Sequence, residues 1–541
     1  MTRLELVWPN KDRFLLVPKD KGGKPVWVER DHPAAAEVRV SDFTADIGEL
    51  NDSDPFADNL LFTGDSLDVL RILTEVPEYK RAYRGKVKQV YIDPPFNTGQ
   101  AFAHYDDWLE HATWLSFMRD RLLLIRDLLA PDGSVWVHLD DAEQHRMRAL
   151  MDEVFGASNF VATVIWKKAD SPRNSARHFS VDQDNIHVYA KDASAWRPNR
   201  LPRTAEADAE YKNPDNDPLG PWTPGDPFAN KFYSLGEYDV TGPTGNVFGP
   251  PPGRYWRVSK ERFEELDREG RIFWRGGGDA RPRIKRYLSE VGDLVPRTVW
   301  DYTDVGSSGE GSRESRRLFP GVPVFATPKP ERLLERLIRL GTQPNDIVLD
   351  CFAGSGSTAA VAHKMGRRWV TAEISVDTVD SFTCRRLEAV VKGDDPGGIT
   401  KAVEWNGGGG FRSVEVGPSM YVDTDYGVLL SEAATNGTFS KAVAGQLGYE
   451  FQLDATPLCG VRGRMRLSVL DGSVGEEEVR AIVAALNEGE RVEIVGRSVL
   501  DGAVTTLNSI AKGSKISKAP RDLLTKTALR NRRRAEREVR G

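Results

Sequence analysis

The sequence predicts an α/β protein built on a mostly parallel sheet. Three observations support this fold class: strand-like and helix-like segments alternate, one strand-like segment stops at two prolines, and another runs into a glycine-rich turn that opens a helix. This alternation is typical of parallel sheets, whose strands are joined by helices. At roughly 150 residues per domain, the chain of 541 residues is expected to form roughly three to four domains.

The first half of this alternation occupies residues 56–157. Its expected elements are, in order, a strand at 60–63, a helix at 67–76, a strand at 87–93, a helix at 114–129 and a strand at 134–139. The run VKQVYID at 87–93 predicts a buried strand, because it is β-branched and apolar and stops at Pro94-Pro95. Two prolines cannot continue a hydrogen-bonded ladder, so they end the strand.

The second half of the alternation occupies residues 323–400. Its expected elements are a helix at 331–340, a strand at 345–350, a helix at 358–365 and a strand at 368–373. Between the halves, residues 158–322 are rich in Pro, Gly, Asn and Asp and contain six of the 13 Trp residues. We therefore expect one sheet that is interrupted by an insertion with its own irregular fold.

Two further regions flank the expected sheet. Residues 1–55 form an N-terminal extension. After residue 401, a glycine run at 407–410 is typical of a linker or a tight loop. The shorter strand-like segments beyond it, together with a helix expected at 476–487, predict a small C-terminal accessory domain over 401–541 that ends in a basic tail.

Composition excludes several classes of protein. With 40% hydrophobic and 9% aromatic residues, the chain has enough apolar material for a buried core and is not a disordered sequence. No apolar run approaches the ~18 residues of a membrane span, and the N-terminus lacks the layout of a secretory signal, so we expect a cytoplasmic protein. Cys351, Cys384 and Cys459 cannot form a disulfide framework.

No metal site is expected. His138, Asp140, Asp141 and His145 lie close together in the sequence and carry metal-binding groups. However, His138 closes an expected strand and the other three open a helix, so we expect helix-capping and surface roles for them.

The net charge is -6, but acidic and basic residues are distributed unevenly along the chain. Residues 42–58 carry six acidic residues and no Lys or Arg, whereas residues 511–541 carry eleven Lys or Arg and three acidic residues. The basic tail has three possible roles: it contacts DNA, it binds the acidic run of a second copy of the chain, or it is a frayed helix.

A second basic region lies inside the insertion. Residues 271–300 contain seven Lys or Arg and three acidic residues, interleaved with Phe273, Trp274, Tyr287 and Trp300. Such a mixture suits a surface that follows phosphates and stacks on bases, although it also occurs on ordinary solvated faces. The tightest cluster is predicted to contact DNA phosphates and consists of Arg281, Arg283, Lys285 and Arg286.

The glycine-rich turn VLDCFAGSGSTAAVAHKMG predicts a ligand site. Asp350 ends a strand, and Gly354 and Gly356 let the backbone approach a ligand before the next helix begins. Three ligands compete. A phosphate loop would need a Lys beside the Ser/Thr, and a dinucleotide fingerprint would need a third glycine where Ala359 stands. The third candidate, S-adenosylmethionine, fits better, because a second acid, Glu373, ends the next strand and can accept both ribose hydroxyls.

The segment IDPPFNTG predicts a site that activates an exocyclic amino group of a base. An exocyclic amino group on a base is a poor nucleophile, because its lone pair is delocalised into the ring. The Asp93 carboxylate and the Pro94 carbonyl can each accept one N–H of that group, Pro95 stiffens the loop, and Phe96 can stack on a base that has left the duplex. The alternative is that the prolines only end the strand and Phe96 is a core residue. Ligands of open α/β sheets bind at this edge, which favours the catalytic role.

Through these motifs, the chain resembles the amino-methylating DNA methyltransferases of the permuted β order. Within them it is most similar to the adenine-specific modification subunits of type III restriction-modification systems. The segments that carry the resemblance, in the family's order, are LLFTGDSLDVL, VYIDPPFNTG, GSVWVHLDDAEQH, DEVFGASNFV, VFATPKPERLLERLI, VLDCFAGSGST and WVTAEIS. The resemblance implies a Rossmann-like, S-adenosylmethionine-dependent core, circularly permuted, with a target-recognition region inserted at 158–322.

The resemblance also implies roles for individual residues. The catalytic motif corresponds to Asp93, Pro94, Pro95 and Phe96, and the cofactor-binding positions correspond to Asp350, Phe352, Gly354, Gly356, Glu373, Asp65, Lys329 and Pro330. Within that second set, Lys329 and Pro330 match a segment that covers the methionine end of the cofactor, and Asp65 matches a position near its adenine. Phe96 stands where many relatives have Tyr, which removes a hydroxyl contact but keeps the stacking face.

The function implied is transfer of a methyl group from S-adenosylmethionine to adenine N6 at specific sites in double-stranded DNA. The implied partners include a second copy of the chain and a separate restriction subunit that holds the helicase and nuclease. Two alternatives stay open: methylation of cytosine N4, which poses the same chemical problem, and a catalytically weak DNA-binding specificity subunit. Asp rather than Ser at position 93 favours adenine.

Overall fold

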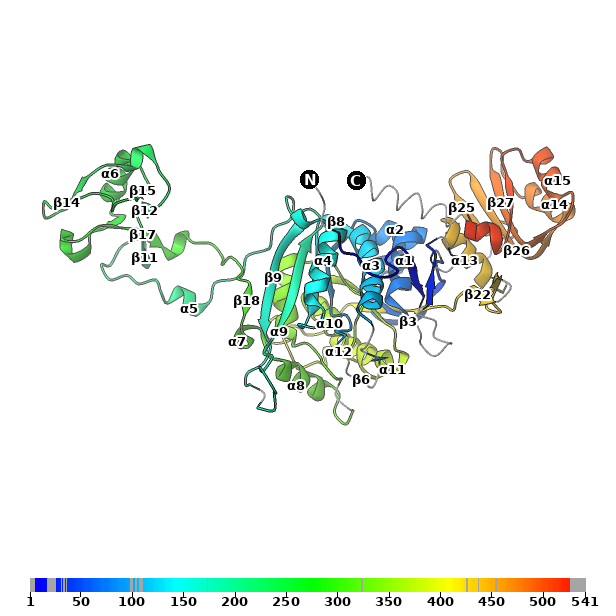
Figure 1. Ribbon diagram of the computed structural model, residues 1–541, viewed down its shortest axis with the longest axis horizontal. Helices are drawn as coiled ribbons and strands as arrows, with labels where there is room; N and C mark the ends of the chain where they lie inside the picture. The colour runs from blue at the N-terminus through cyan, green and yellow to red at the C-terminus, as the bar shows by residue number, and fades with distance from the viewer. Residues whose placement is uncertain are drawn as a thin grey trace. The chain divides into compact units, whose positions relative to one another are not determined.

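The computed structural model describes residues 5–16, 26–30, 32, 35, 37–97, 101–102, 105–106, 110–172, 174–322, 325–424, 427–435, 437–452 and 456–525 (Figure 1). The chain divides into two compact units. Unit 1 consists of Met1–Asn199 and Arg297–Gly541, and unit 2 is Arg200–Pro296.

A ten-stranded sheet forms the centre of unit 1. Its strands, in spatial order, are β18 (Val299–Trp300), β9 (Phe160–Lys167), β10 (Gln183–Ala190), β8 (Leu129–Leu139), β5 (Val87–Ile92), β19 (Ile347–Asp350), β20 (Arg368–Glu373), β4 (Asn59–Thr63), β21 (Gly410–Val416) and β3 (Ser41–Gly48). The strands from β8 to β21 in this order all run parallel, whereas β10 and β3 are antiparallel to their neighbours. The predicted mostly parallel α/β sheet is therefore confirmed.

Two groups of helices pack against this sheet (Figure 1). The first group is α1 (Ser66–Glu75), α2 (Pro77–Tyr83), α3 (His111–Leu128) and α4 (Gln144–Phe155), and the second is α9 (Glu331–Gly341), α10 (Ser357–Lys364) and α12 (Cys384–Lys392). Gln89 of β5 donates to the carbonyl of Leu337 in α9 at 3.0 Å, whereas its neighbour Val90 lies in the apolar cluster of α1 and α3. Successive strand residues point to opposite faces, so the two groups cover opposite faces of the sheet.

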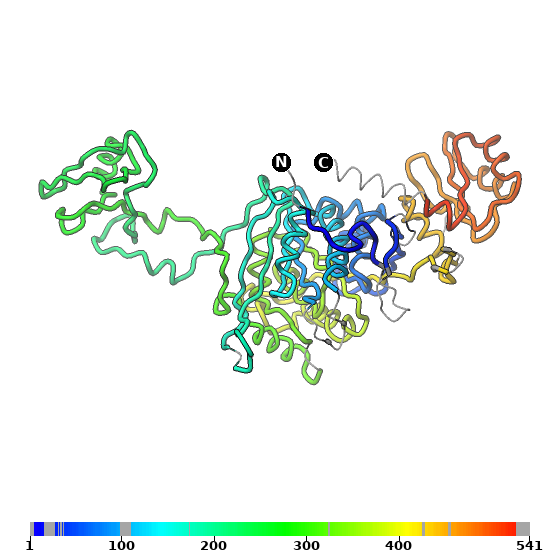
Figure 2. The backbone as a smooth tube through the Cα atoms, in the orientation of Figure 1, coloured from blue at the N-terminus to red at the C-terminus, as the bar shows by residue number. Residues whose placement is uncertain are grey.

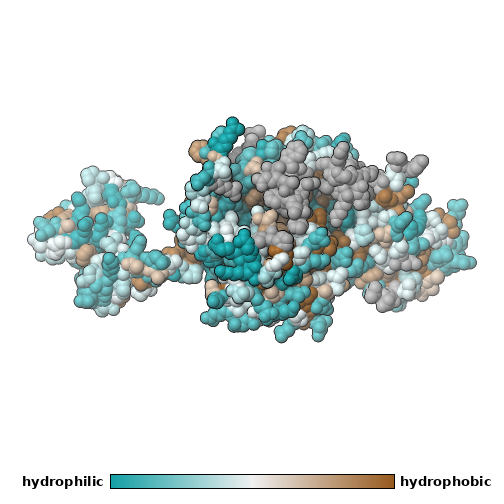
Figure 3. Space-filling model, turned by 90° about the horizontal axis from the view of Figure 1, so that it is seen from below, coloured by the Kyte–Doolittle hydropathy of each residue, from teal (hydrophilic) through white to brown (hydrophobic). Residues whose placement is uncertain are grey.

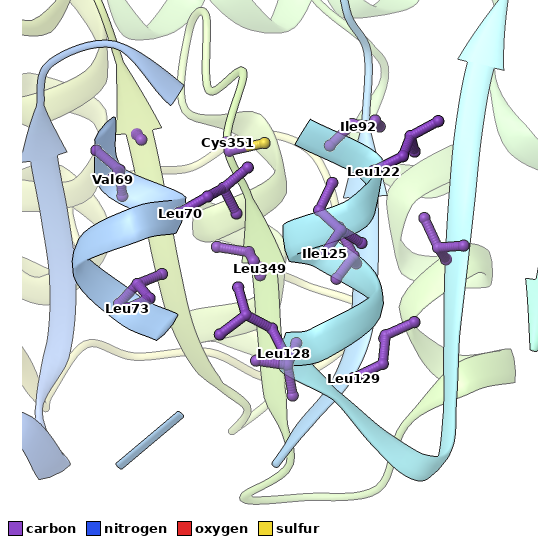
Figure 4. Close-up of a cluster of buried hydrophobic side chains, with 14 of the residues drawn as sticks. Val69, Leu70, Leu73, Ile92, Leu122, Ile125, Leu128, Leu129, Leu349 and Cys351 are labelled. Carbon is purple, nitrogen blue, oxygen red and sulfur yellow. The ribbon is translucent and has the colours of Figure 1, made fainter. Parts of the chain in front are cut away.

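The apolar core lies between the sheet and the first helix group. In Figure 4, Leu70 and Leu73 of α1 and Ile125 and Leu128 of α3 converge on Leu349 of β19. All five side chains are fully buried. Burying one such side chain stabilises the fold by about 1.5–3 kcal/mol relative to leaving it in water. Ile92 of β5 and Leu122 of α3 belong to the same cluster, so the strand and the helix expected on either side of Pro94 pack against each other here.

The boundary of the insertion differs from the predicted 158–322. Strands β9 and β10 pair with each other and β10 pairs with β8, so both belong to the central sheet. Their inward side chains, including Val164 and Val188, are buried. The chain also returns to unit 1 before residue 322, since α7 (Tyr302–Val305) and α8 (Ser308–Leu318) belong to that unit. The separately compact unit is therefore only Arg200–Pro296.

Unit 2 has a small mixed fold, in agreement with the irregular fold that its composition predicts. Its elements are α5 (Ala205–Asp208), the three-stranded sheet β11 (Trp222–Gly225), β17 (Arg283–Tyr287) and β16 (Ile272–Phe273), the pairs β12 (Phe228–Ala229) with β15 (Tyr255–Trp256) and β13 (Val240–Thr241) with β14 (Val247–Phe248), and α6 (Lys260–Arg268). An aromatic core holds them together around Trp256 and Phe263. The chain enters and leaves through two segments that pair at Leu201 and Leu294 (Figure 2).

The C-terminal part of the described chain forms a five-stranded sheet within unit 1. Its elements are β24 (Glu450–Phe451), β25 (Gly460–Arg462), β26 (Met465–Val474), β27 (Arg491–Val499) and β28 (Lys515–Lys518), with helices α13 (Thr438–Leu447), α14 (Glu476–Ala484) and α15 (Ala503–Ile510). The helix expected at 476–487 is present as α14. The basic tail beyond residue 525 lies outside the described residues, so its three possible roles stay predictions.

Short elements complete the fold. They are the strand pairs β1 (Phe14–Leu16) with β2 (Val26–Val28), β6 (Ala101–Phe102) with β7 (Tyr105–Asp106) and β22 (Tyr421–Thr424) with β23 (Gly427–Leu430), and helix α11 (Val376–Thr378). On the face of the molecule seen in Figure 3, hydrophobic residues are scattered among hydrophilic ones. No helix in the described ranges is long and apolar enough to cross a membrane.

The acidic run at 42–58 is partly neutralised within the chain. Asp42 pairs with Lys441 at 2.5 Å, and Arg412 of β21 pairs with Asp46 at 2.9 Å and with Asp58 at 2.7 Å. These ion pairs fasten β3 to the rest of unit 1. Less of the run is therefore available to a basic partner than the sequence predicts.

Candidate active site

The strand order brings together four acidic residues that are far apart in the sequence. Strands β5, β19, β20 and β4 are neighbours and run parallel, so their carboxyl ends meet at one edge of the sheet. Asp93 follows β5, Asp350 ends β19, Glu373 ends β20, and Asp65 follows β4. The structure thus places all four predicted acidic site residues at one edge, where ligands of open α/β sheets bind.

The two oxygens of the Asp93 carboxylate differ. Oδ2 forms an ion pair with the ammonium of Lys329. Oδ1 is buried and accepts no hydrogen bond from any described residue. A buried acceptor without a donor is costly in a folded protein, and such an atom calls for a functional explanation. The arrangement leaves Oδ1 available to a donor that enters the site.

Phe96 has a cation and an aromatic ring as neighbours. The Lys329 ammonium lies 5.2 Å from the centroid of the Phe96 ring, and the ring of His138 stacks near it at 6.0 Å with an interplanar angle of 29°. The loop that follows β5 is also anchored to α3, because the indole N–H of Trp114 donates to the Pro95 carbonyl at 2.9 Å. The backbone immediately before Phe96 is therefore anchored to α3.

His138 belongs to a buried polar chain that the sequence did not predict. Its ring nitrogens lie 2.9 Å from the Tyr91 hydroxyl and 3.2 Å from Oδ2 of Asp184, whose Oδ1 accepts from Lys168 at 2.6 Å. Burial would raise the pKa of Asp184, but the hydrogen bond and charge of His138 and the charge of Lys168 lower it to about 2. The expected cap or surface role of His138 is wrong, because this side chain is fully buried in β8.

The neighbours of His138 in the sequence do not cap α4, whose N-cap residue is Glu143. Asp140 accepts from the Ala142 amide at 2.9 Å in the turn before the helix, and His145 has the expected surface position at the start of α4. Within the described part of the chain, no cluster of three or more His, Cys, Asp or Glu could hold a metal ion.

The glycine turn after β19 has the backbone geometry that only glycine adopts easily. Gly354 has φ +51° and Gly356 has φ +75°, and a Cβ at either position would come within 3.0 Å of a neighbouring side chain. The Gly354 amide donates to Oε2 of Glu373 at 2.9 Å, and the Ser375 amide donates to Oε1 at 3.0 Å. Glu373 therefore shapes the turn as well as facing it.

Asp350 sits at the base of this turn. Its Oδ1 accepts from the Phe352 amide at 3.0 Å, and its side chain is only 3% exposed. Burial is the main cause that raises the pKa of Asp350 to about 7; hydrogen bonds from Thr358 and Phe352 oppose it, and the charges of Asp93 and Glu373 add to it. A carboxyl group in this state suits a ligand that brings a positive charge.

Asp65 is the N-cap residue of α1, and its carboxylate is paired with Arg121. It accepts from the Leu67 amide at 2.8 Å, and Arg121 donates to both carboxylate oxygens at 2.9 and 3.0 Å. The Arg121 guanidinium also lies 3.5 Å from the Phe117 ring centroid. The sequence missed Arg121, although a buried Arg in the apolar run of α3 is a signal that a charged partner lies opposite.

A second residue that the sequence missed is Glu143. It is fully buried and accepts from Asn97 at 2.7 Å and from Arg146 at 3.1 Å, and it lies 2.5 Å from the ring of His111. Asn97 has φ +61° directly after Phe96. Glu143 therefore anchors the residue that follows the predicted catalytic motif.

The segment predicted to cover the cofactor precedes α9. Pro330 is the N-cap residue of this helix, which places Lys329 immediately before it. Lys329 reaches Asp93 across 236 positions of the chain. The geometry thus brings Lys329 to Asp93, at the same edge as the glycine turn.

The four basic residues of unit 2 do not form one uniform surface. Lys285 is 8% exposed and pairs with Asp215 at 2.6 Å and with Asp217 at 2.5 Å. Arg283 pairs with Asp226 at 3.5 Å, whereas Arg281 and Arg286 are exposed.

Two of the four aromatic residues near this cluster are not available for stacking, whereas Phe273 and Trp274 are half-buried. Tyr287 and Trp300 are each 1% exposed and belong to the protein core, so they cannot stack on a base. Their ring area is covered by their own neighbours, as for most large aromatic side chains.

Comparison with known proteins adds independent evidence. The family described as DNA methylase matches residues 87–383. The chain is 48% identical over 304 residues to the type II methyltransferase M1.MboII of Moraxella bovis, a match that covers 56% of this chain and 90% of that protein.

Two type III relatives are also similar. The type III restriction-modification enzyme StyLTI Mod subunit of Salmonella typhimurium is 33% identical over 333 residues, which covers 56% of this chain and 49% of that protein. The EcoPI Mod subunit of Escherichia phage P1 is 30% identical over 369 residues, which covers 56% of this chain and 55% of that protein. The matches therefore span about half the length of these two relatives.

Proposed function

The chain belongs to the DNA methylase family, and on this premise we propose that it transfers a methyl group from S-adenosylmethionine to adenine N6 at specific sites in DNA. The observation that carries the proposal is the carboxyl edge of the central sheet. There Asp93, with one oxygen lacking a donor, lies at the same edge as the glycine turn that Asp350 and Glu373 flank. A group that accepts an amino N–H and a group that holds a cofactor thus share one site.

The residues of this edge fit S-adenosylmethionine. Asp350 is buried without an ion pair among the described residues, and its raised pKa marks a place where a positive ligand group would be favourable. Glu373 can accept ribose hydroxyls, and the two glycines adopt the positive φ angles that the turn requires. When bound, the cofactor supplies a methyl group on a sulfonium, which is already electrophilic.

The chain's own residues would prepare the amino group. Asp93 and the Pro94 carbonyl each accept one N–H, which draws the nitrogen toward tetrahedral geometry and frees its lone pair. Lys329 balances the charge at Oδ2 of Asp93 and so leaves Oδ1 for the incoming donor. Phe96 offers a ring on which a base that has left the duplex stacks. Alignment of the reacting atoms then supplies much of the rate enhancement.

Two alternatives remain separate candidates. Cytosine N4 presents the same amino group, but Asp rather than Ser at position 93 favours adenine. A catalytically weak DNA-binding subunit is disfavoured, because Asp93, Gly354, Gly356 and Glu373 are all present and brought to one edge. A cofactor-binding titration separates that second candidate from an enzyme.

The proposal extends to partners and domains. We assign double-stranded DNA as the substrate and unit 2, with Arg281 and Arg286, as part of the target-recognition surface. The type III relatives are named Mod subunits of restriction-modification enzymes, so a separate restriction subunit and a second copy of the chain are proposed partners. A cytoplasmic location would follow from this role.

Sequencing of modified bases tests the proposal directly. DNA from cells that express the chain should carry N6-methyladenine at one recurring sequence, and DNA from cells that express Asp93→Ala should not. N4-methylcytosine at a recurring sequence would support the first alternative. Unmodified DNA together with normal cofactor binding would overturn the proposed activity.

A further inference from the structure

Unit 2 exposes three large apolar side chains in one short segment. Residues 230–235 are all exposed, and within them Phe232 is 64%, Leu235 59% and Tyr233 37% exposed. We call these three residues the apolar knob. Single exposed apolar residues are ordinary, but several together on a small domain mark an interaction site.

The knob stands on a rigid base. It follows β12, which pairs with β15, and the Phe232 ring meets the Tyr255 ring edge-on at 5.2 Å. Arg254 donates to the Asn230 side chain at 3.1 Å and to Asp226 at 2.6 Å, and so ties down the start of the segment. Because this base is already ordered, a partner would not have to order it on binding.

The end of the segment is fixed as well. A Cβ at Gly236 would lie 2.6 Å from the Trp256 carbonyl oxygen, so the backbone passes directly over the buried aromatic core. The indole N–H of Trp256 donates to the Tyr238 carbonyl at 2.8 Å. The exposed side chains therefore project from a backbone that is held on both sides.

Several cations lie near the knob, and one ion-pair network connects it to the basic cluster. Asp226 links Arg254 of the knob's base to Arg283 of β17, and the Arg286 side chain packs against Gly225, where a Cβ would lie 2.7 Å from its Nε. Lys231 is exposed within the segment, and Arg257 is exposed two residues after Tyr255.

Acidic residues lie beyond the C-terminal end of the segment. Glu237 and Asp239 are exposed there, and Glu261 and Glu264 of α6 act on nearby Tyr238. At the N-terminal end, Asp226 is already shared between Arg254 and Arg283. The segment thus places apolar side chains beside exposed cations, a combination that suits contact with both the bases and the phosphates of a nucleic acid.

We propose that the apolar knob contacts the bases of duplex DNA in a groove, while Lys231, Arg257 and Arg286 lie along the phosphates. This inference rests on the proposed function and adds the part of unit 2 that meets the bases. Proteins insert apolar side chains between base steps or against thymine methyl groups, and both interactions depend on the DNA sequence. The knob thereby contributes to the choice of site.

A salt titration of DNA affinity tests the inference. The double variant Phe232→Ser/Leu235→Ser is compared with the wild-type chain on DNA that contains the methylated sequence. We expect affinity to fall by about tenfold, the scale of one stacking interaction between a base and an aromatic ring. The slope of log affinity against log salt should not change, because apolar side chains release no counterions when they meet DNA.

Two controls accompany this variant. Val247→Ser removes another exposed apolar side chain of unit 2, 62% exposed in β14, and should leave affinity unchanged. Leu235→Ser alone leaves the rings of Phe232 and Tyr255 packed together, so it should give a smaller loss in the same direction and guards against misfolding of the double variant. Thermal unfolding of each variant checks that unit 2 remains folded.

Other outcomes overturn the inference. Unchanged affinity in the double variant would mean that the knob faces solvent. A shift from dimer to monomer with unchanged DNA affinity would assign the knob to a second copy of the chain, and a shallower salt slope would assign it to phosphates. Failure of the wild-type chain to methylate any DNA would instead defeat the proposed function, so the two failures are distinguishable.

Discussion

The active-site edge of unit 1 and the basic surface of unit 2 hold their charged residues in different ways. At the edge, each acidic residue follows or ends a strand of one buried sheet, whatever its partner: backbone amides hold Asp350 and Glu373, and the cations Arg121 and Lys329 pair with Asp65 and Asp93. In unit 2, charged side chains hold one another, as Lys285 does with Asp215 and Asp217.

This difference shows which kind of motif can be located in the fold from the sequence alone. The carboxyl ends of neighbouring parallel strands lie at the same edge of the sheet. Motifs at these strand ends are therefore brought together by the strand order alone. A run of cations has no such constraint. Whether each cation faces solvent depends on which acidic residues the fold brings near it, so Lys285 is internal while Arg286 is exposed.

The largest effect should come from the catalytic carboxylate. Asp93→Ala is expected to lower the methylation rate at least ~100-fold, since a positioned transition-state acceptor is worth ~3 kcal/mol. Cofactor binding should stay near normal, because Asp350 and Glu373 are untouched. The matched control is Asp52→Ala, an exposed acid of the same unit, which should keep full activity. A methylation rate within a few-fold of the wild type, measured under single-turnover conditions, would break the assignment.

The second largest effect tests whether cofactor binding and catalysis depend on different residues of the edge. Glu373→Ala should weaken cofactor binding by about 1.5–3 kcal/mol, because the ribose hydroxyls lose a charged acceptor. The Gly354 amide loses its acceptor too, so Glu373→Gln, which keeps one oxygen, should lose less. Calorimetry measures the dissociation constant, and an unchanged value for Glu373→Ala would show that the cofactor binds elsewhere.

A third experiment sharpens the contrast between the two regions. Arg281→Ala/Arg286→Ala should make the slope of log DNA affinity against log salt shallower by roughly 1.8, or about 0.9 for each phosphate that the protein no longer neutralises. Neutralising Arg283 and Lys285 as well should change the slope little further, because both are already paired. Lys285→Met should instead lower the unfolding temperature. If Lys285→Met alone flattened the salt slope, its ion pairs would have to open on DNA.

The smallest effect concerns the protonation of Asp350 in the ligand-free protein. Its pKa is raised to about 7 in the fold, above the ordinary value of 3.8, so the folded state binds the proton more tightly than the unfolded state. The stability that this proton contributes is fully present below pH about 4 and is lost as the pH rises through about 7. Between pH 6 and 8 the loss should be roughly 1 kcal/mol.

Denaturant unfolding at a series of pH values checks this effect. Asp350→Asn cannot titrate, so its stability should fall less than that of the wild type between pH 6 and 8. Glu314, whose pKa burial also raises to about 7, titrates in both proteins and cancels from the difference. Parallel pH profiles for the two proteins would show that Asp350 is ionised throughout this range.

Much of the active-site edge could be predicted from the sequence. The strand that stops at Pro94, the turn with Gly354 and Gly356, and Glu373 at the end of the next strand are all local patterns, and each appears where it was expected. Local patterns are readable because they depend on a few neighbouring residues: apolar periodicity, missing amide donors and positive φ angles.

The supporting residues could not be predicted in the same way. Arg121, His138 and Glu143 lie in ordinary helical or strand patterns, and their importance depends on partners that arrive from other segments. The strands β9 and β10 were missed because the insertion was expected to begin too early: residues 158–199 contain two Pro and no Gly, and the Pro- and Gly-rich stretches follow after residue 200.

The sequence by itself determined the fold class, the order of the motifs and the acidic residues at the strand ends, because these follow from short-range periodicity and from the geometry of parallel strands. Only the tertiary structure decided which charges are neutralised. Lys329 meets Asp93 from 236 positions away and Lys285 meets Asp217 from 68 positions away. Such pairs form when packing of the whole chain brings two buried charges together, because an unpaired buried charge is too costly to leave.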